Sequence, residues 1–147
     1  MIKGTESILS IYDGTAYRPI ACITSNSLTS TLSEIESNTK CNPGVVKKSP
    51  GTLNRSISVD GEMIDTTSVG GDTAQASWDY LWDRQEQQAN DAAPIEFKYT
   101  TGVTDDDKYG ECILTDLVQT AGSGDEIITF SATLSVSGDI VSADPNA

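Results

Sequence analysis

The sequence predicts a mainly β fold, an antiparallel β-sandwich flanked by one α-helix and carrying a long loop. Several segments alternate apolar and hydroxyl side chains with a period of two, the pattern of half-buried strands. Asp-Gly and Pro-Gly pairs separate these segments, and only one stretch changes to a helical period. A length of 147 residues suits one domain, so we expect a single β domain over residues 1–140, with 141–147 as a flexible tail.

The first two strands are expected to form a hairpin. Residues 6–12 alternate, and Asp13-Gly14 follows them directly, which is a strong hairpin signal. Residues 17–22 fit the returning strand, and Pro19 restricts that strand to a sheet edge or a bulge.

The third strand, predicted over residues 24–32, has one face made only of hydroxyl side chains. These are Ser25, Ser27, Thr29 and Thr31. A further strand is expected over residues 53–61, ending at Asp60-Gly61.

Between these strands, residues 38–52 hold two Pro-Gly pairs and no sustained periodicity, which predicts a long exposed loop. Its basic residues Lys40, Lys47 and Lys48 stand out in an acidic chain. They fit either a solvated loop or a contact with an acidic surface on a neighbouring copy.

Residues 72–90 change to a helical period. Asp72 and Gln75 resemble a capping box, and the side chains that follow recur at i, i+3, i+4 and i+7. We expect an amphipathic helix whose apolar residues anchor it to the core; these are Trp78, Leu81 and Trp82.

Three strands are predicted after the helix. Residues 94–100 place Ile95, Phe97 and Tyr99 on one face, an acidic turn follows, and residues 109–120 form the next strand. The last strand shows the clearest alternation of the chain, with Ile128, Phe130, Ala132, Leu134 and Val136 on its apolar face. Its other face carries Thr129, Ser131, Thr133, Ser135 and Ser137, as expected of a sheet with one packed side and one wet side.

Composition argues against several functions. The chain has 22 acidic and 9 basic residues and a formal net charge of −13, which disfavours tight binding to nucleic acid or to an anionic membrane. It has no histidine, which removes the commonest catalytic base and zinc ligand, so we expect neither an enzyme nor a bound cofactor or metal. Three cysteines without metal-like or redox-like spacing, and no apolar signal peptide or membrane span, indicate a chain folded in a cytoplasm.

The order of these motifs resembles that of the phage major tail protein, or tail tube protein, family. The resemblance runs from about residue 3 to 140: the strand closed by Tyr12-Asp13-Gly14-Thr15, the hydroxyl-rich strand, the long loop, the helix, and a terminal Ser/Thr-alternating strand. It implies a structural subunit that assembles into stacked hexameric rings, forming a tube through which DNA passes without specific binding. It also implies a virion location after assembly in a bacterial host, and tail terminator, baseplate or tail-tip and tape-measure proteins as partners.

Within this resemblance, the loop would make the contact between rings. The candidate contact residues are Lys40, Asn42, Val45, Val46, Lys47 and Lys48. The hydroxyl strands would line the lumen, with Ser25, Ser27, Thr29, Thr31, Thr129, Ser131, Thr133 and Ser135 as candidates. Alternatives are a tube subunit of a contractile injection or secretion particle, and a monomeric carbohydrate-binding or adhesin-like sandwich that would use Tyr12 or Tyr17.

Overall fold

The computed structural model describes residues 1, 3, 7–20, 22–37, 44, 46–64, 76–124 and 127–146. Their elements are β1 (Ile8–Tyr12), β2 (Tyr17–Pro19), β3 (Ile23–Ser37), β4 (Lys47–Glu62), α1 (Trp78–Asp91), β5 (Ile95–Thr100), β6 (Asp107–Thr120) and β7 (Thr129–Val141). All seven strands join one antiparallel sheet in the order β2-β1-β5-β6-β7-β4-β3. The prediction of a mainly antiparallel β fold is confirmed.

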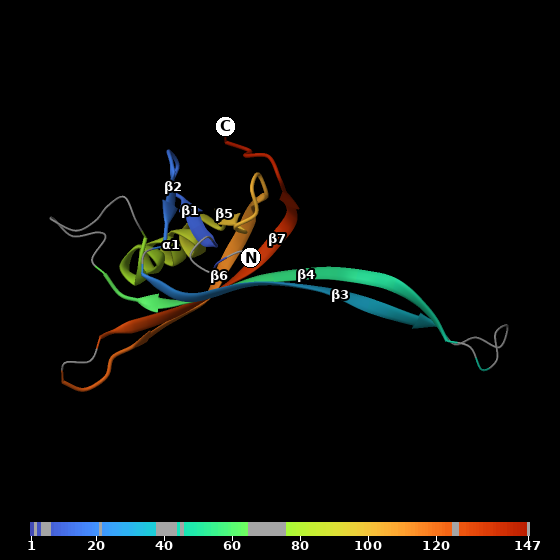
Figure 1. Cartoon of the computed structure of the whole chain (residues 1–147), viewed down its shortest axis with the longest axis horizontal. Coiled ribbons are helices and arrows are strands. Elements are labelled where there is room, and N and C mark those ends of the chain that lie inside the picture. The colour runs from blue at the N-terminus through green and yellow to red at the C-terminus, as the bar shows by residue number, and fades with distance from the viewer. Residues whose placement is uncertain are drawn as a thin grey trace.

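The two layers expected of a sandwich are two halves of this single sheet. Strand β5 pairs with β6 only as far as Cys112, whereas β4 pairs with the first half of β7, from Thr129 to Ser135. The long strands β6 and β7 therefore connect the two halves. The sheet curls enough for Asn26 on β3 to donate a hydrogen bond of 3.3 Å to the Ser7 carbonyl just before β1. Figure 1 shows α1, β1, β2 and β5 gathered on one side of the long β3–β4 ribbon.

One hydrophobic core lies between the two halves and α1. Its fully buried members come from both halves, for example Leu9 and Phe97 from one and Ile57 and Leu134 from the other. Burying a side chain of this size stabilises the fold by about 1.5–3 kcal/mol. The predicted apolar face of β5 is confirmed as buried, and so are Phe130, Ala132 and Leu134 of β7. Ile128 lies before β7 and is 39% exposed, so it is not part of this face.

Helix α1 begins at Trp78 rather than at residue 72. Ala76 forms a parallel bridge with Ile20 beside β2, and Ser77 has an extended backbone, so neither residue is helical. The Ser77 hydroxyl accepts a hydrogen bond of 3.1 Å from the Ile64 N–H and makes no side-chain cap of the helix. The predicted capping box, Asp72 with Gln75, lies outside the described residues.

The prediction of Trp82 as a core anchor is wrong. Leu81 is buried, but Trp82 is 44% exposed and stacks on the half-buried Trp78 at 5.2 Å between ring centroids. The buried side of α1 is centred on Tyr80 and Leu81, so Trp82 lies one position past the core-facing stripe.

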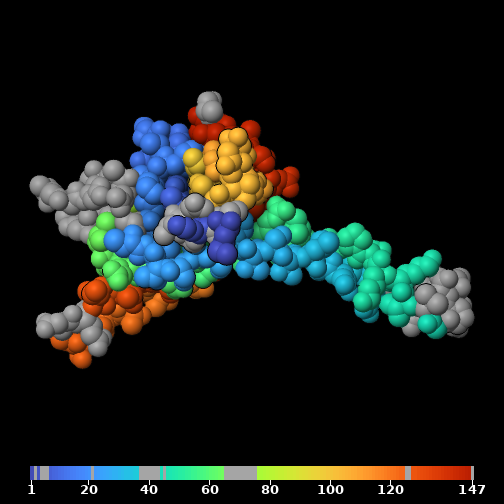
Figure 2. Space-filling model, in the orientation of Figure 1, coloured from blue at the N-terminus to red at the C-terminus, as the bar shows by residue number. Residues whose placement is uncertain are grey.

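The predicted loop over residues 38–52 is partly strand, because β4 begins at Lys47 and pairs with β3 as far as Ser37. Residues 30–37 and 47–55 form a two-stranded ribbon that pairs with no other described strand, and we call this ribbon the arm. It projects from the body of the molecule (Figures 1 and 2). Its length is about 27 Å at the usual rise per residue. Lys40, Asn42 and Val45 lie outside the described residues.

Pro50-Gly51 is therefore part of a strand and not a turn. A register shift between Leu32 and Glu34 places an extra β4 residue opposite Ser33. Proline is tolerated at bulges and in strands with a free side, and the arm offers both. Similarly, Asp60-Gly61 continues β4, and a Cβ atom at Gly61 would approach the Cys22 carbonyl oxygen to 2.9 Å.

Two residues of the predicted flexible tail, Asp144 and Asn146, contact β2 and β5. The Tyr17 hydroxyl donates to Asp144 at 2.9 Å, and the Asn146 amide donates to Glu96 at 2.9 Å. Burial, together with the neighbouring Asp144 carboxylate, raises the pKa of Tyr17 to about 12.

Replacing Tyr17 by Phe should lower the stability of the unassembled protein by about 1 kcal/mol below pH 10, the usual cost of one hydrogen bond. Since the folded state holds the Tyr17 proton more tightly than the unfolded state, this stabilisation is lost as pH rises from 10 towards 12. Urea denaturation of wild type and Tyr17→Phe at pH 8 and pH 11.5 measures both effects. An equal difference between the two proteins at both pH values would contradict the prediction.

Candidate functional site: a polar face of the sheet

The side of the sheet that faces away from the core is covered by hydroxyl groups. Residues paired across antiparallel strands point to the same side, so the register of β3, β4, β7 and β6 defines rows of neighbouring side chains. Three rows cross all four strands: Thr29–Ser56–Ser135–Ile113, Ser27–Ser58–Thr133–Asp116 and Ser25–Asp60–Ser131–Val118. A fourth row crosses three strands: Glu62–Thr129–Thr120. We call these four rows the hydroxyl face.

The structure brings together the candidate lumen residues from β3 and β7, which are about a hundred positions apart in the chain. Seven of the eight fall in the four rows, and Thr31 continues the same side onto the arm, where it pairs with Asn54. Sequence reasoning missed the contribution of β4, Ser56, Ser58 and Asp60, which lies between the two predicted strands. The signal was present, since these residues alternate with the buried Ile57 and Val59.

Carboxylates give the hydroxyl face its charge. Asp60, Glu62 and Asp116 belong to its rows, and no lysine or arginine does. Asp60 accepts a hydrogen bond of 3.2 Å from the Ser25 hydroxyl, so its carboxylate is held among the hydroxyl groups. The face is therefore hydrated, hydrogen-bonding and negative.

Two apolar side chains lie at the β6 border of this face. Ile113 and Val118 are 42% and 51% exposed. A shallow hollow of about 360 Å³ opens beside the fourth row, lined by Thr24, Asp60, Gly61, Thr120, Thr129, Phe130 and Ser131. With one carboxylate and several hydroxyls, the hollow repeats the chemistry of the surrounding face.

The arm exposes a second surface, and that surface is more apolar than the sequence suggested. Lys48 forms exposed ion pairs with Glu34 at 3.4 Å and Glu36 at 4.0 Å, so its charge is offset within the arm. Large apolar side chains are about half exposed along the arm and at its end: Leu32, Ile35, Val46 and Leu53. Of the predicted contact residues that are described, Val46 lies at the arm's end, next to Lys47 and Lys48 at the start of β4.

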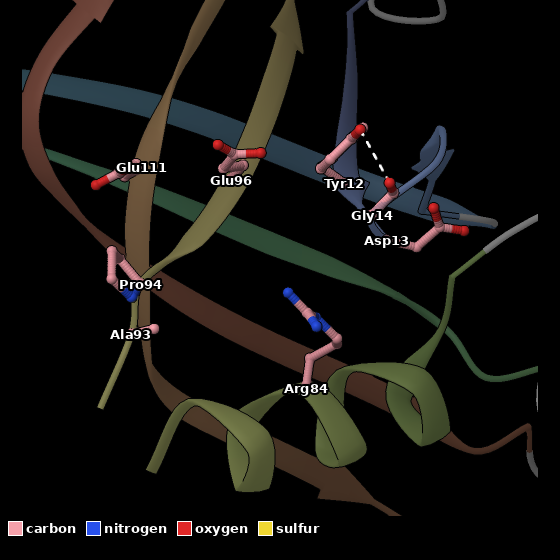
Figure 3. Close-up of a pocket in the computed structure, with 8 residues that line it drawn as sticks. All are labelled: Tyr12, Asp13, Gly14, Arg84, Ala93, Pro94, Glu96 and Glu111. Carbon is pink, nitrogen blue, oxygen red and sulfur yellow. Dashed lines mark hydrogen bonds between the residues drawn. The ribbon is translucent and has the colours of Figure 1, made fainter. Parts of the chain in front are cut away.

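A third polar region lies where α1 meets the turn after β1 and the start of β5 (Figure 3). Arg84 points from α1 into a hollow of about 330 Å³ that Asp13, Glu96 and Glu111 also line. The Arg84 Nη1 atom donates to Gln87 at 2.8 Å, and its buried Nε has no hydrogen-bond partner among the described residues. Charges of both signs thus face one hollow, without a described ion pair between them.

The tyrosines that a carbohydrate-binding role would use stack against one another. Tyr12 and Tyr17 lie 5.0 Å apart and are tilted by 50°, and Tyr17 and Tyr109 lie 5.8 Å apart and are tilted by 60°. They therefore do not form a flat platform. Over the described part of the chain, no group of three metal-ligating side chains occurs, and no helix is long and apolar enough to cross a membrane.

Solved structures with the same fold come from tail tubes and injection particles. No family model and no curated protein matches the sequence. The tail of an empty gene transfer agent (GTA) particle, with C6 symmetry, contains a similar chain with a TM-score of 0.66 at 16% identity, covering 96% of this chain and 98% of that one.

Two further structures give comparable values. The SPP1 tail tube has a TM-score of 0.63 at 15% identity, covering 94% of this chain and 77% of that one. The sheath-tube complex of the extracellular contractile injection system PVC, in its extended state, has a TM-score of 0.64 at 16% identity, covering 96% and 90%. The chain therefore has the fold of tail tube proteins, as the resemblance in its sequence implies.

Proposed function

We propose that this protein is the structural subunit of a tail tube, in which copies form stacked hexameric rings and the hydroxyl face lines a conduit for DNA. The observation that carries the proposal is the hydroxyl face itself, a hydroxyl and carboxylate surface without lysine or arginine on a tail tube fold. The C6 symmetry of the gene transfer agent tail supports six copies in a ring.

The chemistry of the hydroxyl face suits transit better than binding. Proteins hold DNA mainly by placing lysine and arginine on its phosphates, and this face offers none in its rows. Asp60, Glu62 and Asp116 would repel the phosphates, while the hydroxyl groups would keep a layer of water on the wall. A lumen of this kind lets DNA slide without being retained.

Open strand edges support closure into a ring. Strand β3 forms one border of the sheet, and no other described strand pairs with its outer side over Ile23–Ser37. Exposed edges of this length invite pairing with another chain. Strand β6 also has an open edge, because beyond Cys112 it pairs only with β7 among the described strands. If β3 paired with this part of β6 on the next copy, the hydroxyl faces would join into one continuous wall.

The arm supports stacking of the rings. An isolated two-stranded hairpin is marginally stable in water, and this one exposes Leu32, Leu53 and Ile35 along its length. A contact with the neighbouring ring would cover these side chains and support the arm. Deletion of the arm is therefore a direct test of stacking.

The same subunit design also suits a contractile injection particle, and the match to the PVC sheath-tube complex favours that second candidate. In either case we propose a structural protein without catalytic activity. Its partners would be further copies of itself, a tail terminator, a tape-measure protein and a baseplate or tail-tip protein. It would be made in the bacterial host and located in the assembled particle.

Purified protein at rising concentration should form rings about one subunit thick and then tubes, visible by negative-stain electron microscopy and as a steep rise in light scattering. Strictly monomeric behaviour of the intact chain at millimolar concentration would contradict the proposal. Six-fold class averages would distinguish a hexameric ring from other closed symmetries.

A further inference from the structure

Two glutamines of α1 hydrogen-bond to the backbone of a single residue on β6. The Gln85 Nε2 atom donates to the Leu114 carbonyl at 3.2 Å, and the Leu114 N–H donates to Gln88 Oε1 at 3.0 Å. Positions three apart lie on the same side of a helix, so both amides face the strand together. They satisfy the same pair of backbone groups that a neighbouring strand would.

Leu114 lies at the point where β5 stops covering β6. The last pair between β5 and β6 is Ile95 with Cys112, although β6 continues to Thr120. Beyond Cys112, β6 pairs only with β7 among the described strands. The outer side of β6 is thus covered by β5 up to Cys112, by the two glutamines at Leu114, and by no described strand from Asp116 onwards.

We propose that Gln85 and Gln88 are positioning residues that fix the register between neighbouring copies, by closing the β6 edge at Leu114 and leaving Asp116–Thr120 for β3 of the next copy. The inference rests on the ring proposed above. A second copy suits this open edge because β3 is itself an edge strand with hydroxyl groups on the same side of the sheet.

A block at this point is needed because the strands themselves define their register poorly. A slip of two residues keeps every side chain on its own side of the sheet, so it would move one serine or threonine of β3 into the place of another. Ser25, Ser27 and Thr29 are nearly equivalent in such a slip. With the Leu114 backbone open, the slipped register would gain two hydrogen bonds and compete with the correct one.

The simpler role, support of the helix on the sheet, is separated from this one by measuring the register directly. Disulfides form only when Cα atoms are about 4.4–6.8 Å apart, so a bond between copies reports which residues face each other. Cys22 and Cys41 would be replaced by Ser. Cys112 can stay because it is buried, and burial raises the pKa of its thiol to about 12. One cysteine would replace Val118 on β6, and a second would be placed in turn at Ser25, Ser27, Thr29 or Thr31 on β3.

When the four cysteine pairs are compared in the wild-type background, one of them should give most of the disulfide between copies in assembled rings. In Gln85→Ala/Gln88→Ala, the share of that disulfide should fall about two-fold or more, and a second pair displaced by two residues should appear. Gln87→Ala is the matched control, because Gln87 contacts Arg84 and not β6, and it should keep the single pair. Gln88→Glu retains the acceptor for the Leu114 N–H and should also keep it.

The same dominant disulfide in folded Gln85→Ala/Gln88→Ala would overturn the inference, because the glutamines would then only support the helix. Circular dichroism establishes that each variant is folded, and the single variant Gln88→Ala replaces the double one if that does not fold. Tubes that form without any disulfide between β3 and β6 would exclude this pairing but leave the tube proposal standing. Failure of the wild-type protein to assemble would exclude both.

Discussion

Replacing residues 31–54 by Asn-Gly is expected to leave a folded protein that forms rings but not tubes. Ser30 and Arg55 are directly paired, so a two-residue turn can join them and remove the arm without changing the rest of the sheet. The body should keep its stability because the arm contributes no member of the buried core. Thermal unfolding of the unassembled variant should therefore match the wild type within a few degrees.

The expected loss of stacking is large because the contact is repeated in every copy. Covering a half-exposed Leu, Ile or Val side chain contributes about 1 kcal/mol, and the arm exposes four such side chains. Without them the critical concentration for tube formation should rise about 100-fold or more, measured by sedimentation of tubes across a dilution series.

A less drastic pair of variants tests whether the apolar side of the arm carries this effect. Leu32→Ser with Leu53→Ser keeps the length of the arm but removes two of its four exposed apolar side chains, and should raise the critical concentration about 10-fold. Thr31→Ser with Asn54→Ser alters the neighbouring pair on the opposite side and is the matched control. Equal stacking by both double variants would exclude a contact through Leu32 and Leu53.

The arm also shows where sequence reasoning reached its limit. Pro50-Gly51 has the composition of a turn, and only the pairing with β3 shows that it lies in a strand. A free two-stranded ribbon lacks the apolar alternation of a half-buried strand, so local sequence cannot distinguish it from a loop. Leu32 and Leu53 continue the core-facing alternation of β3 and β4, so the sequence predicts that they are buried. They are exposed because the arm extends beyond the core.

The hydroxyl face was more accessible to prediction. Alternation with a period of two determines the side of each residue once a strand is recognised, so the faces of β3 and β7 could be assigned separately. Their position in one continuous surface depends on β4 lying between them, which is a long-range property of the sheet. The helix was found, but it begins later than predicted because Ala76 bridges to Ile20. Its buried side is centred on Tyr80 and Leu81 and leaves Trp82 exposed. Gln85 falls at the i+7 position of the predicted helix face, but a contact of Gln85 or Gln88 with β6 could not be predicted, since glutamine on a helix is usually solvated.

Reversing the charge of the hydroxyl face should convert a passive wall into one that retains DNA. Asp60→Lys with Asp116→Lys places two cations per copy in neighbouring rows, where the wild type has two carboxylates. Both positions are exposed, so the fold should tolerate the change. In a ring of copies the lysines would form a cationic belt, and duplex DNA present during assembly should remain in the tubes.

Two measurements test this prediction: the salt dependence of DNA retention and the protection of the retained DNA from nuclease. Binding through six to ten phosphates weakens by about 10³–10⁵ between 50 and 200 mM salt, so retention should disappear over that range. DNA held in the lumen should resist nuclease at 50 mM salt. Asp83→Lys with Glu86→Lys provides the same charge change on the exposed side of α1, where bound DNA should be digested. Asp60→Asn with Asp116→Asn should retain no DNA, because removing repulsion supplies no attraction.

Nuclease protection tests whether the hydroxyl face lines the lumen, since the opposite side of the sheet is packed in the core. Protected DNA in the Asp60→Lys/Asp116→Lys tubes, with digested DNA on the α1 variant, would place the hydroxyl face in the lumen. Digestion in both would place that face outside, and the acid excess of this chain would then serve solubility rather than transit. Wild-type tubes should protect no DNA at any salt concentration, because a conduit for DNA delivery has to release everything that enters it.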